Sequence, residues 1–397
     1  SYSGQLHRST DGGESWTDVD GSDGEYWDLA WHPQDENIVY ALKQAGRWVT
    51  YHRSTDGGKS FQSAGQGLPI ESDSTRIYRG RFATSIAAPK RIWVLYGGTL
   101  NDTLGGVWGL YTSFNSGETF NEVCCGEVDG PEPPNPDTNP NIFDYSINGL
   151  GLGQITWDMI FAVSSTDTSL MVAGGIFPYV SQDGGRTWKV ADPMHYDVQD
   201  AVIIDTSIIV SHDGGLAEVH PTNRNVIDRS FGICALEVWG FGQSHVRDVL
   251  TVGAYHMPTY VRDKSLYDST GLADGWYPWS GADAMSADVN PDDDRWIYAK
   301  PWSSVRGDRS RSTQIPPRAV PLGIDLGYIP LTNVAFHPNE TYTIVAADHS
   351  TTSIVRSTDN AGTWEELMTF DTWISHVKIS QQYPNWLAAI GDGKLMV

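Results

Sequence analysis

The chain has 397 residues, of which 26 are Lys or Arg and 49 are Asp or Glu, so its formal net charge is −23 at pH 7. This charge repels nucleic acids and anionic membranes, and we expect neither as a partner. The sequence contains no run of 18 apolar residues, so we expect no segment that spans a bilayer. The acidic surface instead favours a secreted, cell-surface or periplasmic protein.

One short phrase recurs from the first residues to the last, in the pattern S-x-D-x-G-x-[ST]-[WF]. The carboxylate and the hydroxyls can hydrogen-bond the backbone of a tight turn, glycine adopts positive φ at little cost, and the closing aromatic can enter a core. The phrase therefore predicts a structural turn and not a catalytic site. Its copies are Ser9–Trp16, Ser54–Phe61, Ser113–Phe120, Ser181–Trp188, the altered copy Ser357–Trp364, and a weak candidate at 211–215 that is equally consistent with a different turn.

Paired short apolar runs lie between these copies and predict the inner strands of repeated units. Similar turns at His32-Pro33, Asn290-Pro291 and His337-Pro338 support the register between the units. We count eight of them: 27–42, 82–97, 157–174, 197–210, 233–253, 284–300, 331–347 and 374–390.

The phrase resembles the Asp-box, or bacterial neuraminidase repeat, which implies an all-β fold, the β-propeller. We expect one domain of four-stranded antiparallel blades, with eight blades favoured over seven. Residues 1–20 would complete the blade begun by 374–397 and so close the ring. The resemblance also implies that Asp11, Asp56, Asn115, Asp183 and Asp359 lie in peripheral hairpins, with Trp16, Phe61, Phe120, Trp188 and Trp364 buried. A piece of a longer protein with two propellers, or a chain that has lost a leader, is also consistent with the sequence.

Sialidases, endo-xyloglucanases, sortilin-type receptors and photosystem assembly factors share this repeat, so it does not fix an activity. A typical sialidase is disfavoured, because its Phe-Arg-Ile-Pro motif is missing. The segment Tyr78-Arg79-Gly80-Arg81-Phe82 resembles that motif only weakly. The sequence resembles xyloglucanase-like and sortilin-type propellers more than it resembles a typical sialidase.

A glycosidase needs two carboxylates that face each other across a cleft. Carboxylates that open predicted inner strands are the candidates, although capping of turns or pairing with arginines is the simpler interpretation of them. They are Asp197, Asp200, Asp283 and Asp288.

Three stretches exceed what connections between blades require: 126–154, 263–283 and 301–328. The second is aromatic and the third holds a basic cluster, so together they predict a surface for an acidic glycan or a protein. A hydrophobic lid and internal ion pairs are the alternatives. The candidates for ligand binding are Trp276, Tyr277, Trp279, Trp302, Arg306, Arg309 and Arg311.

The sequence predicts no cofactor and no metal site formed by Cys or His. Asp292-Asp293-Asp294 and the turn at 137–141 are interpreted as hydrated turns, with structural calcium as the alternative because hard oxygen ligands cluster there. Cys124, Cys125 and Cys234 allow at most one disulfide.

These features favour a binding or scaffold module for an extracellular protein or glycan. The alternatives are a xyloglucanase-like glycoside hydrolase with paired aspartates, and a structural or assembly subunit of a larger extracytoplasmic complex.

Overall fold

The computed structural model describes residues 4–70, 75–100, 104–124, 141–143, 155, 157–191, 194–233, 237–266, 273–281, 287–300, 304–308, 319–327, 334–391 and 394–396. The chain divides into two compact units, Ser1–Ile233 and Cys234–Val397, and each is described here by itself. The helices of the described part are the short 3₁₀ segments η1 (Lys264–Leu266) and η2 (Ala273–Gly275), and neither is a candidate membrane span.

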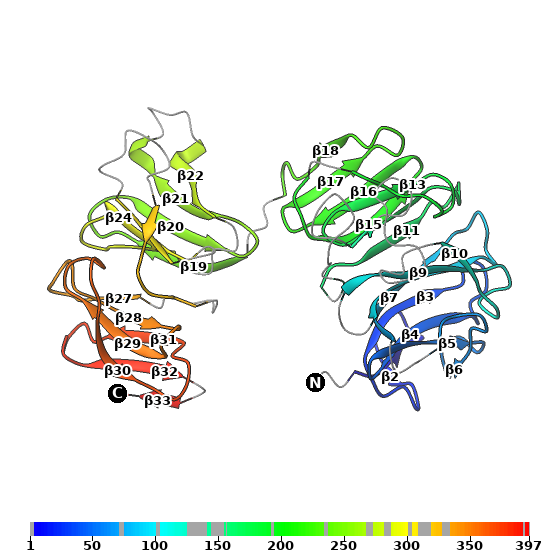
Figure 1. Ribbon diagram of the computed structural model, residues 1–397, viewed down its shortest axis with the longest axis horizontal. Coiled ribbons are helices and arrows are strands. Elements are labelled where there is room, and N and C mark those ends of the chain that lie inside the picture. Colours follow the sequence, from blue (N-terminus) through cyan, green and yellow to red (C-terminus); the bar gives the residue numbers. More distant parts are fainter. Residues whose placement is uncertain are drawn as a thin grey trace. The chain divides into compact units, whose positions relative to one another are not determined.

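The described residues of the first unit form four four-stranded antiparallel sheets and one two-stranded sheet (Figure 1). The two-stranded sheet consists of β1 (His7–Arg8) and β2 (Thr17–Asp18). The four-stranded sheets consist of β3 (Tyr26–Trp31), β4 (Val39–Ala45), β5 (Trp48–Ser54) and β6 (Gln62–Ser63); β7 (Thr75–Thr84), β8 (Ile92–Leu100), β9 (Leu104–Ser113) and β10 (Asn121–Cys124); β11 (Ile160–Val163), β12 (Met171–Gly174), β13 (Pro178–Ser181) and β14 (Lys189–Val190); and β15 (Val198–Ile204), β16 (Ser207–His212), β17 (Gly215–Val219) and β18 (Val226–Asp228).

The described residues of the second unit form three four-stranded antiparallel sheets and one three-stranded sheet. The four-stranded sheets consist of β19 (Val238–Gln243), β20 (Val249–Ala254), β21 (Thr259–Asp263) and β22 (Trp276–Ser280); β23 (Ala287–Val289), β24 (Trp296–Ala299), β25 (Val305–Asp308) and β26 (Ala319–Pro321); and β27 (Val334–Phe336), β28 (Ile344–Asp348), β29 (Ser353–Ser357) and β30 (Glu365–Thr369). The three-stranded sheet consists of β31 (His376–Ile379), β32 (Leu387–Gly391) and β33 (Lys394–Met396).

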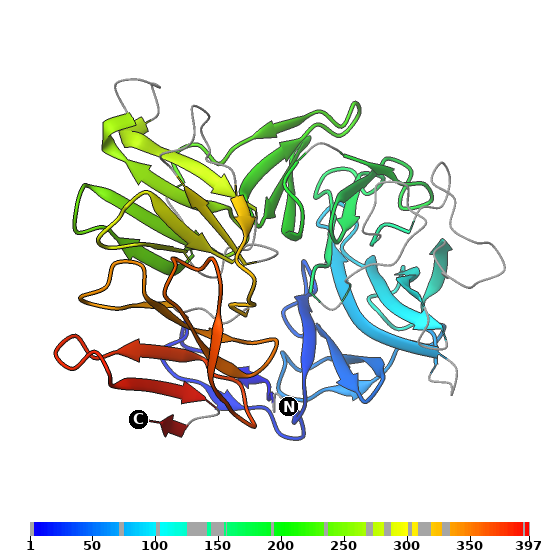
Figure 2. The same cartoon turned by 60° about the vertical axis from the view of Figure 1, so that its left-hand side comes forward.

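Each strand pairs with its neighbour in the sequence, so every sheet is a meander (Figure 2). The first strands of successive sheets contact each other: β3, β7, β11 and β15 in the first unit, and β19 with β23 and β27 with β31 in the second. This is the arrangement of β-propeller blades, with the first strand of each blade innermost.

The eight predicted pairs of inner strands are confirmed, because each coincides with the first two strands of a sheet. The three proline turns are equivalent as predicted. The backbone N–H groups of His32, Asn290 and His337 each donate a hydrogen bond of 2.9–3.0 Å to a carbonyl six residues on.

The two termini belong to different compact units. Closure of a single domain by residues 1–20 and 374–397 therefore stays a prediction, and so does the number of blades. Within the second unit, β33 supplies a third strand beside β32.

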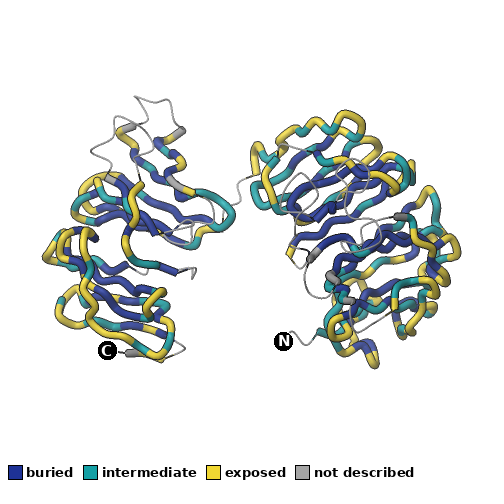
Figure 3. The backbone as a smooth tube through the Cα atoms, in the orientation of Figure 1, coloured by how far each residue is buried: buried dark blue, intermediate teal, exposed yellow. Residues whose placement is uncertain are grey.

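Apolar side chains cluster in the space between neighbouring sheets. Many residues of the central strands are buried (Figure 3). Trp93 and Leu95 of β8, for example, share a cluster with Met171 and Tyr179 of the next sheet. Burial of this apolar surface is the main favourable term in folding.

The Asp-box turns have the predicted geometry, which the copy at Asp183 illustrates. Its carboxylate accepts hydrogen bonds from the hydroxyl of Ser181 at 2.8 Å, the backbone N–H of Thr187 at 2.9 Å and the Thr187 hydroxyl at 2.7 Å. Two consecutive residues with positive φ follow, Gly184 and Gly185.

The altered copy is an intact Asp-box, since Asp359 accepts from the backbone and hydroxyl of Thr363, both at 2.8 Å. Asn360 and Ala361 take the two left-handed positions, with φ of 62° and 61°. The weak candidate at 211–215 is a different turn, because His212 pairs directly with Gly215 across the β16–β17 hairpin.

Burial of the box aromatics is only partly as predicted. Trp188 and Phe120 are buried, and Phe61 and Trp364 are half-buried. Trp16 is 62% exposed, and its burial against a blade of the second unit stays a prediction. A box aromatic packs against the preceding sheet, as Phe120 does on Tyr51 of β5 at 5.2 Å between ring centroids.

Arginines tie successive boxes together, a feature that the sequence reading missed. Arg8 Nε donates to the carbonyl of Gly57 at 2.7 Å, and Arg53 Nε donates to that of Ser116 at 2.8 Å. Arg306 of β25 likewise binds the carbonyl of Asn360, with Nη1 as the donor. Each acceptor directly follows the Asp or Asn of a box, so the positive-φ turn also presents a carbonyl to the neighbouring blade.

We expect Asp183→Ala to lower the free energy of unfolding by about 1–2 kcal/mol, since the turn loses its side-chain acceptors. Asp183→Asn should cost less, because Asn115 serves naturally in another box and its amide donates to Thr119 Oγ1 at 3.0 Å. Denaturant unfolding of both variants measures the difference. Equal losses would show that the hydrogen-bond pattern of the box is not what stabilises it.

Candidate ligand-binding cleft

A cleft in the second unit is bordered by β19, β23, β27 and β31, the first strands of successive sheets. Its volume is about 380 Å³, within the usual range for small-ligand sites. Aromatic, amide, imidazole and charged side chains line it together, among them Phe241, Gln243, His245, Asp288, Asp292, Phe336, His337, Lys378 and Gln381.

A glycine permits the close approach of two strands in the wall of this cleft. A Cβ atom at Gly242 of β19 would lie 2.6 Å from the backbone nitrogen of Val289 and 2.8 Å from Cα of Asp288. Such contacts are too short for any side chain, so glycine allows β19 to pack directly against β23. Asp288 is thereby held in the interior while still lining the cleft.

Asp288 is the most unusual group in the cleft. It is 6% exposed, and its Oδ2 has no hydrogen-bond partner among the described residues. Burial raises the pKa of this carboxyl to about 7, although the charge of Lys378 opposes the shift. Near neutral pH the carboxyl can therefore either donate or accept a hydrogen bond.

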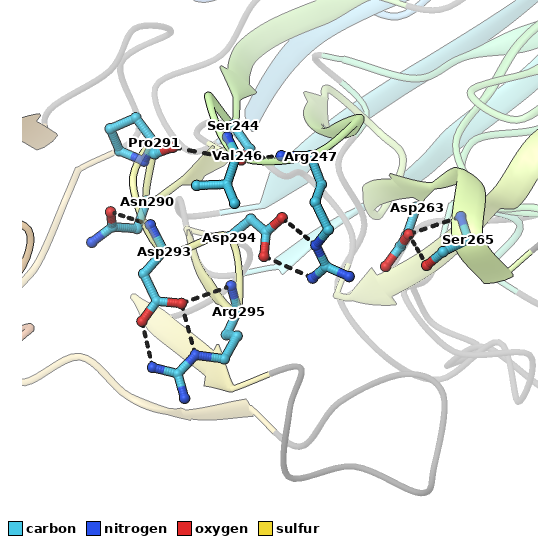
Figure 4. A network of polar contacts seen from close by, with 10 residues as sticks. All are labelled: Ser244, Val246, Arg247, Asp263, Ser265, Asn290, Pro291, Asp293, Asp294 and Arg295. Carbon is cyan, nitrogen blue, oxygen red and sulfur yellow. Dashed lines mark hydrogen bonds and ion pairs between the residues drawn. The ribbon is translucent and has the colours of Figure 1, made fainter.

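A network of polar contacts holds the turns beside the cleft (Figure 4). Arg247 binds both carboxylate oxygens of Asp294, at 2.7 and 2.8 Å, and these hydrogen bonds raise the pKa of the Arg247 guanidinium. His245 donates its backbone N–H to the carbonyl of Pro291 at 2.7 Å, and its Nδ1 lies 3.4 Å from Asp292. The turns after β19 and β23 are thus joined, and they fix His245 and Asp292 at the cleft.

Of the four predicted catalytic carboxylates, the structure places Asp288 in this cleft. Asp197 and Asp200 belong to the first unit, at β15, and Asp200 is exposed, with Oδ1 accepting the N–H of Ala201 at 2.9 Å. Asp283 lies outside the described residues. A catalytic role for any of them stays a prediction.

The predicted aromatic loop is largely the fourth strand of a sheet. Tyr277 and Trp279 in β22 are 3% and 5% exposed and pack with Ile297 and Val305 of the next sheet, so they are not available as exposed anchors. Trp279 fits there because Gly307 leaves room for its ring. Trp276 is half-buried.

The predicted basic cluster falls mostly outside the described residues, as do Trp302, Arg309 and Arg311. Arg306 is described, and it lies over the ring of Trp296 while it binds the Asn360 carbonyl. Most of the predicted insertion at 126–154, together with Cys125 and Cys234, also lies outside the described part.

The acidic run proposed for calcium is engaged with cationic side chains. Asp293 pairs with Arg295, Asp294 pairs with Arg247, and Asp292 faces His245. A calcium ion there would have to displace these partners, and the turn at 137–141 is described only at Asn141. Structural calcium stays a prediction.

Several polar residues of the innermost strands were missed by the sequence reading. In the cleft they include Gln243 and Lys378. In the first unit, Asp28 of β3 accepts the N–H of Phe82 at 2.7 Å and lies 3.8 Å from Arg81. Burial raises the pKa of Asp28. A polar residue inside an otherwise apolar inner strand was the signal that could have found them.

The comparison with family models matches residues 179–190 to the BNR/Asp-box repeat, which confirms the resemblance inferred from the phrase at 181–188. No curated protein matches the chain.

Solved structures with similar folds include a GH74 enzyme from Niastella koreensis, at 14% identity over 92% of this chain and 62% of that chain, with a TM-score of 0.33. A GH74 xyloglucanase from Xanthomonas campestris is 13% identical over 94% of this chain and 66% of that chain, with a TM-score of 0.35. YCF48 from Cyanidioschyzon merolae is 13% identical over 94% of each chain, with a TM-score of 0.29. The chain thus spans less than two thirds of the length of these GH74 proteins.

We expect Asp288→Asn to remove a pH-dependent loss of stability. An unfolded aspartate ionises near pH 4, whereas the folded pKa of Asp288 is about 7, so the folded state holds an extra proton between these values. The free energy of unfolding therefore falls as the pH rises through this range, by up to about 4 kcal/mol for this group. The asparagine variant cannot ionise, so its free energy of unfolding should rise relative to that of the parent by a comparable amount between pH 4 and pH 8.

Denaturant unfolding across this pH range tests the expectation, with the exposed Asp292→Asn as the matched control. Parallel stability curves for the parent and Asp288→Asn would show that the Asp288 carboxyl ionises normally in the folded protein.

Proposed function

We propose that this chain is a glycan-binding β-propeller module that takes a sugar segment in the cleft around Asp288. The observation that supports this most is the buried carboxyl itself. A buried polar atom without a partner costs free energy, and a ligand that supplies a hydrogen bond recovers it. Sugar hydroxyls can donate or accept, so they suit this carboxyl in either protonation state.

The other lining residues also suit a carbohydrate. Phe241 and Phe336 offer flat apolar faces, while Gln243 and Gln381 carry both donors and acceptors. Protein hot spots are instead enriched in Trp, Tyr and Arg. The described lining of this cleft has none of the three, which favours a glycan over a protein partner.

An extracellular setting, proposed from the acidic composition, would give such a module access to polysaccharides. A scaffold role in a larger extracytoplasmic complex is the alternative. It would leave the cleft without a ligand and place the contacts elsewhere on the blades.

We expect Phe241→Ala and Gln243→Ala each to weaken glycan binding by about tenfold, with little change in thermal stability, because both side chains are exposed. Phe231→Ala is the matched control, since Phe231 is fully exposed outside the cleft. Screening the parent on an immobilised glycan panel and titrating the best binder measures these affinities. Unchanged capture by both cleft variants would rule out the cleft as the binding site.

A second candidate function, glycoside hydrolysis, is favoured by the pKa of Asp288. A carboxylic acid that stays protonated near neutral pH can protonate a leaving glycosidic oxygen, and Asp292 is a second carboxylate in the same cleft.

If the cleft is catalytic, Asp288→Asn should abolish the release of reducing ends from a β-glucan while affinity stays nearly intact. Asp359→Asn, an Asp-box change distant in sequence, is the control and should retain turnover. Full activity in Asp288→Asn, or no release by the parent at any pH between 5 and 8, would remove this candidate.

A further inference from the structure

A second cavity, of about 490 Å³, lies in the first unit and is independent of the cleft around Asp288. It is lined by residues at the start of β8, the end of β9 and β10, and by the turns of the next sheet. Two arginines contribute to it: Arg91 directly precedes β8, and Arg186 follows the glycine pair of an Asp-box.

Arg91 is held rigidly by its surroundings. Its guanidinium carbon lies 4.5 Å from the ring centroid of Trp93 and 4.7 Å from that of Phe114, and its Nε donates to Thr112 Oγ1 at 3.1 Å. Burial lowers the pKa of Arg91, and the charge of Arg186 adds to this effect. The two positive charges therefore act on each other within one cavity.

Neither arginine has a carboxylate partner within ion-pair distance among the described residues. Other described arginines do have one, for example Arg229 with Glu218 at 2.5 Å and Arg262 with Asp248 at 2.8 Å. Arg186 Nη1 donates to the carbonyl of Asp183 at 3.0 Å. Two guanidinium groups thus share a cavity without a carboxylate partner among the described residues, in a chain with 49 acidic and 26 basic residues. Glu122 is the acidic residue of the lining, and it is exposed.

We propose that this cavity binds an oxyanion carried by an acidic polysaccharide, with Arg91 and Arg186 as its cationic partners. Guanidinium groups bind carboxylates and sulfates through paired N–H donors. Phe114, which is 61% exposed beside the cavity, adds a flat apolar face that a sugar ring can cover and a free ion cannot. Thr168 supplies a hydroxyl for a further hydrogen bond, whereas the hydroxyl of Ser169 already donates to Asp167 at 2.6 Å.

Two kinds of polysaccharide carry this chemistry, namely those with uronic acid carboxylates and those with sulfate esters. Titration with oligogalacturonate and with dextran sulfate distinguishes them, with neutral dextran and inorganic sulfate as the other arms. The proposal expects binding to at least one of the two charged polymers, weakening as salt is added, and none to neutral dextran.

Exposed Arg186→Gln should weaken this binding by about tenfold. Arg224→Gln makes the same charge change at a half-buried arginine outside the cavity and should alter affinity by less than about twofold. Arg91→Lys retains the charge but loses the planar fork, and it should also weaken binding. Phe114→Ala should weaken binding of the polymer only.

Equal affinities for Arg186→Gln and Arg224→Gln would overturn the proposal, because binding would then follow net charge alone. Inorganic sulfate that binds as tightly as either polymer, with no effect of Phe114→Ala, would also overturn it and show a simple ion site. A melting temperature for each variant confirms that any loss is not due to unfolding.

Discussion

Packing between the faces of neighbouring sheets is the interaction on which the rest of this structure depends. Each cluster joins two successive blades, so most apolar side chains of the central strands are already used. Glycines such as Gly242 and Gly307 occur where the sheets approach too closely for a side chain. Side chains left to meet a ligand therefore lie on the innermost strands or in the turns between strands. Both proposed sites occur at such positions.

The Asp-box adds a second constraint, because it fixes the outer hairpin and at the same time connects blades. Its carboxylate satisfies the N–H groups of the turn, while a carbonyl of the same turn accepts an arginine from the preceding blade at Gly57 and Ser116. The repeat thus stabilises both its own hairpin and the contact with the preceding blade. This explains why a phrase repeated so often carries little information about the ligand.

The sequence was a good guide to architecture because turn chemistry and apolar pairing are local. The first two strands of the eight sheets from β3 onward could be predicted, and the box at Asp183 has the expected hydrogen bonds. The site was harder. Asp288 was among the candidates, but Gln243 and Lys378 line the same cleft from different blades. No local sequence pattern indicates that these residues lie close together. Tyr277 and Trp279 failed as surface residues because burial between sheets depends on the neighbouring blade. Ala361 shows that even a turn signal can be hidden, since it adopts positive φ without being glycine.

The central claim is that the glycan proposed for the cleft around Asp288 contacts the innermost strands of the second unit and not the Asp-box at 357–364. Hydrogen exchange followed by mass spectrometry, with and without the glycan that binds best to the parent, tests this directly. The account predicts slower exchange at residues 238–245, 287–292, 334–338 and 376–381, with unchanged exchange in the box hairpin at 357–364. Protection confined to that hairpin and to the outer strands, with none on the innermost strands, would contradict it.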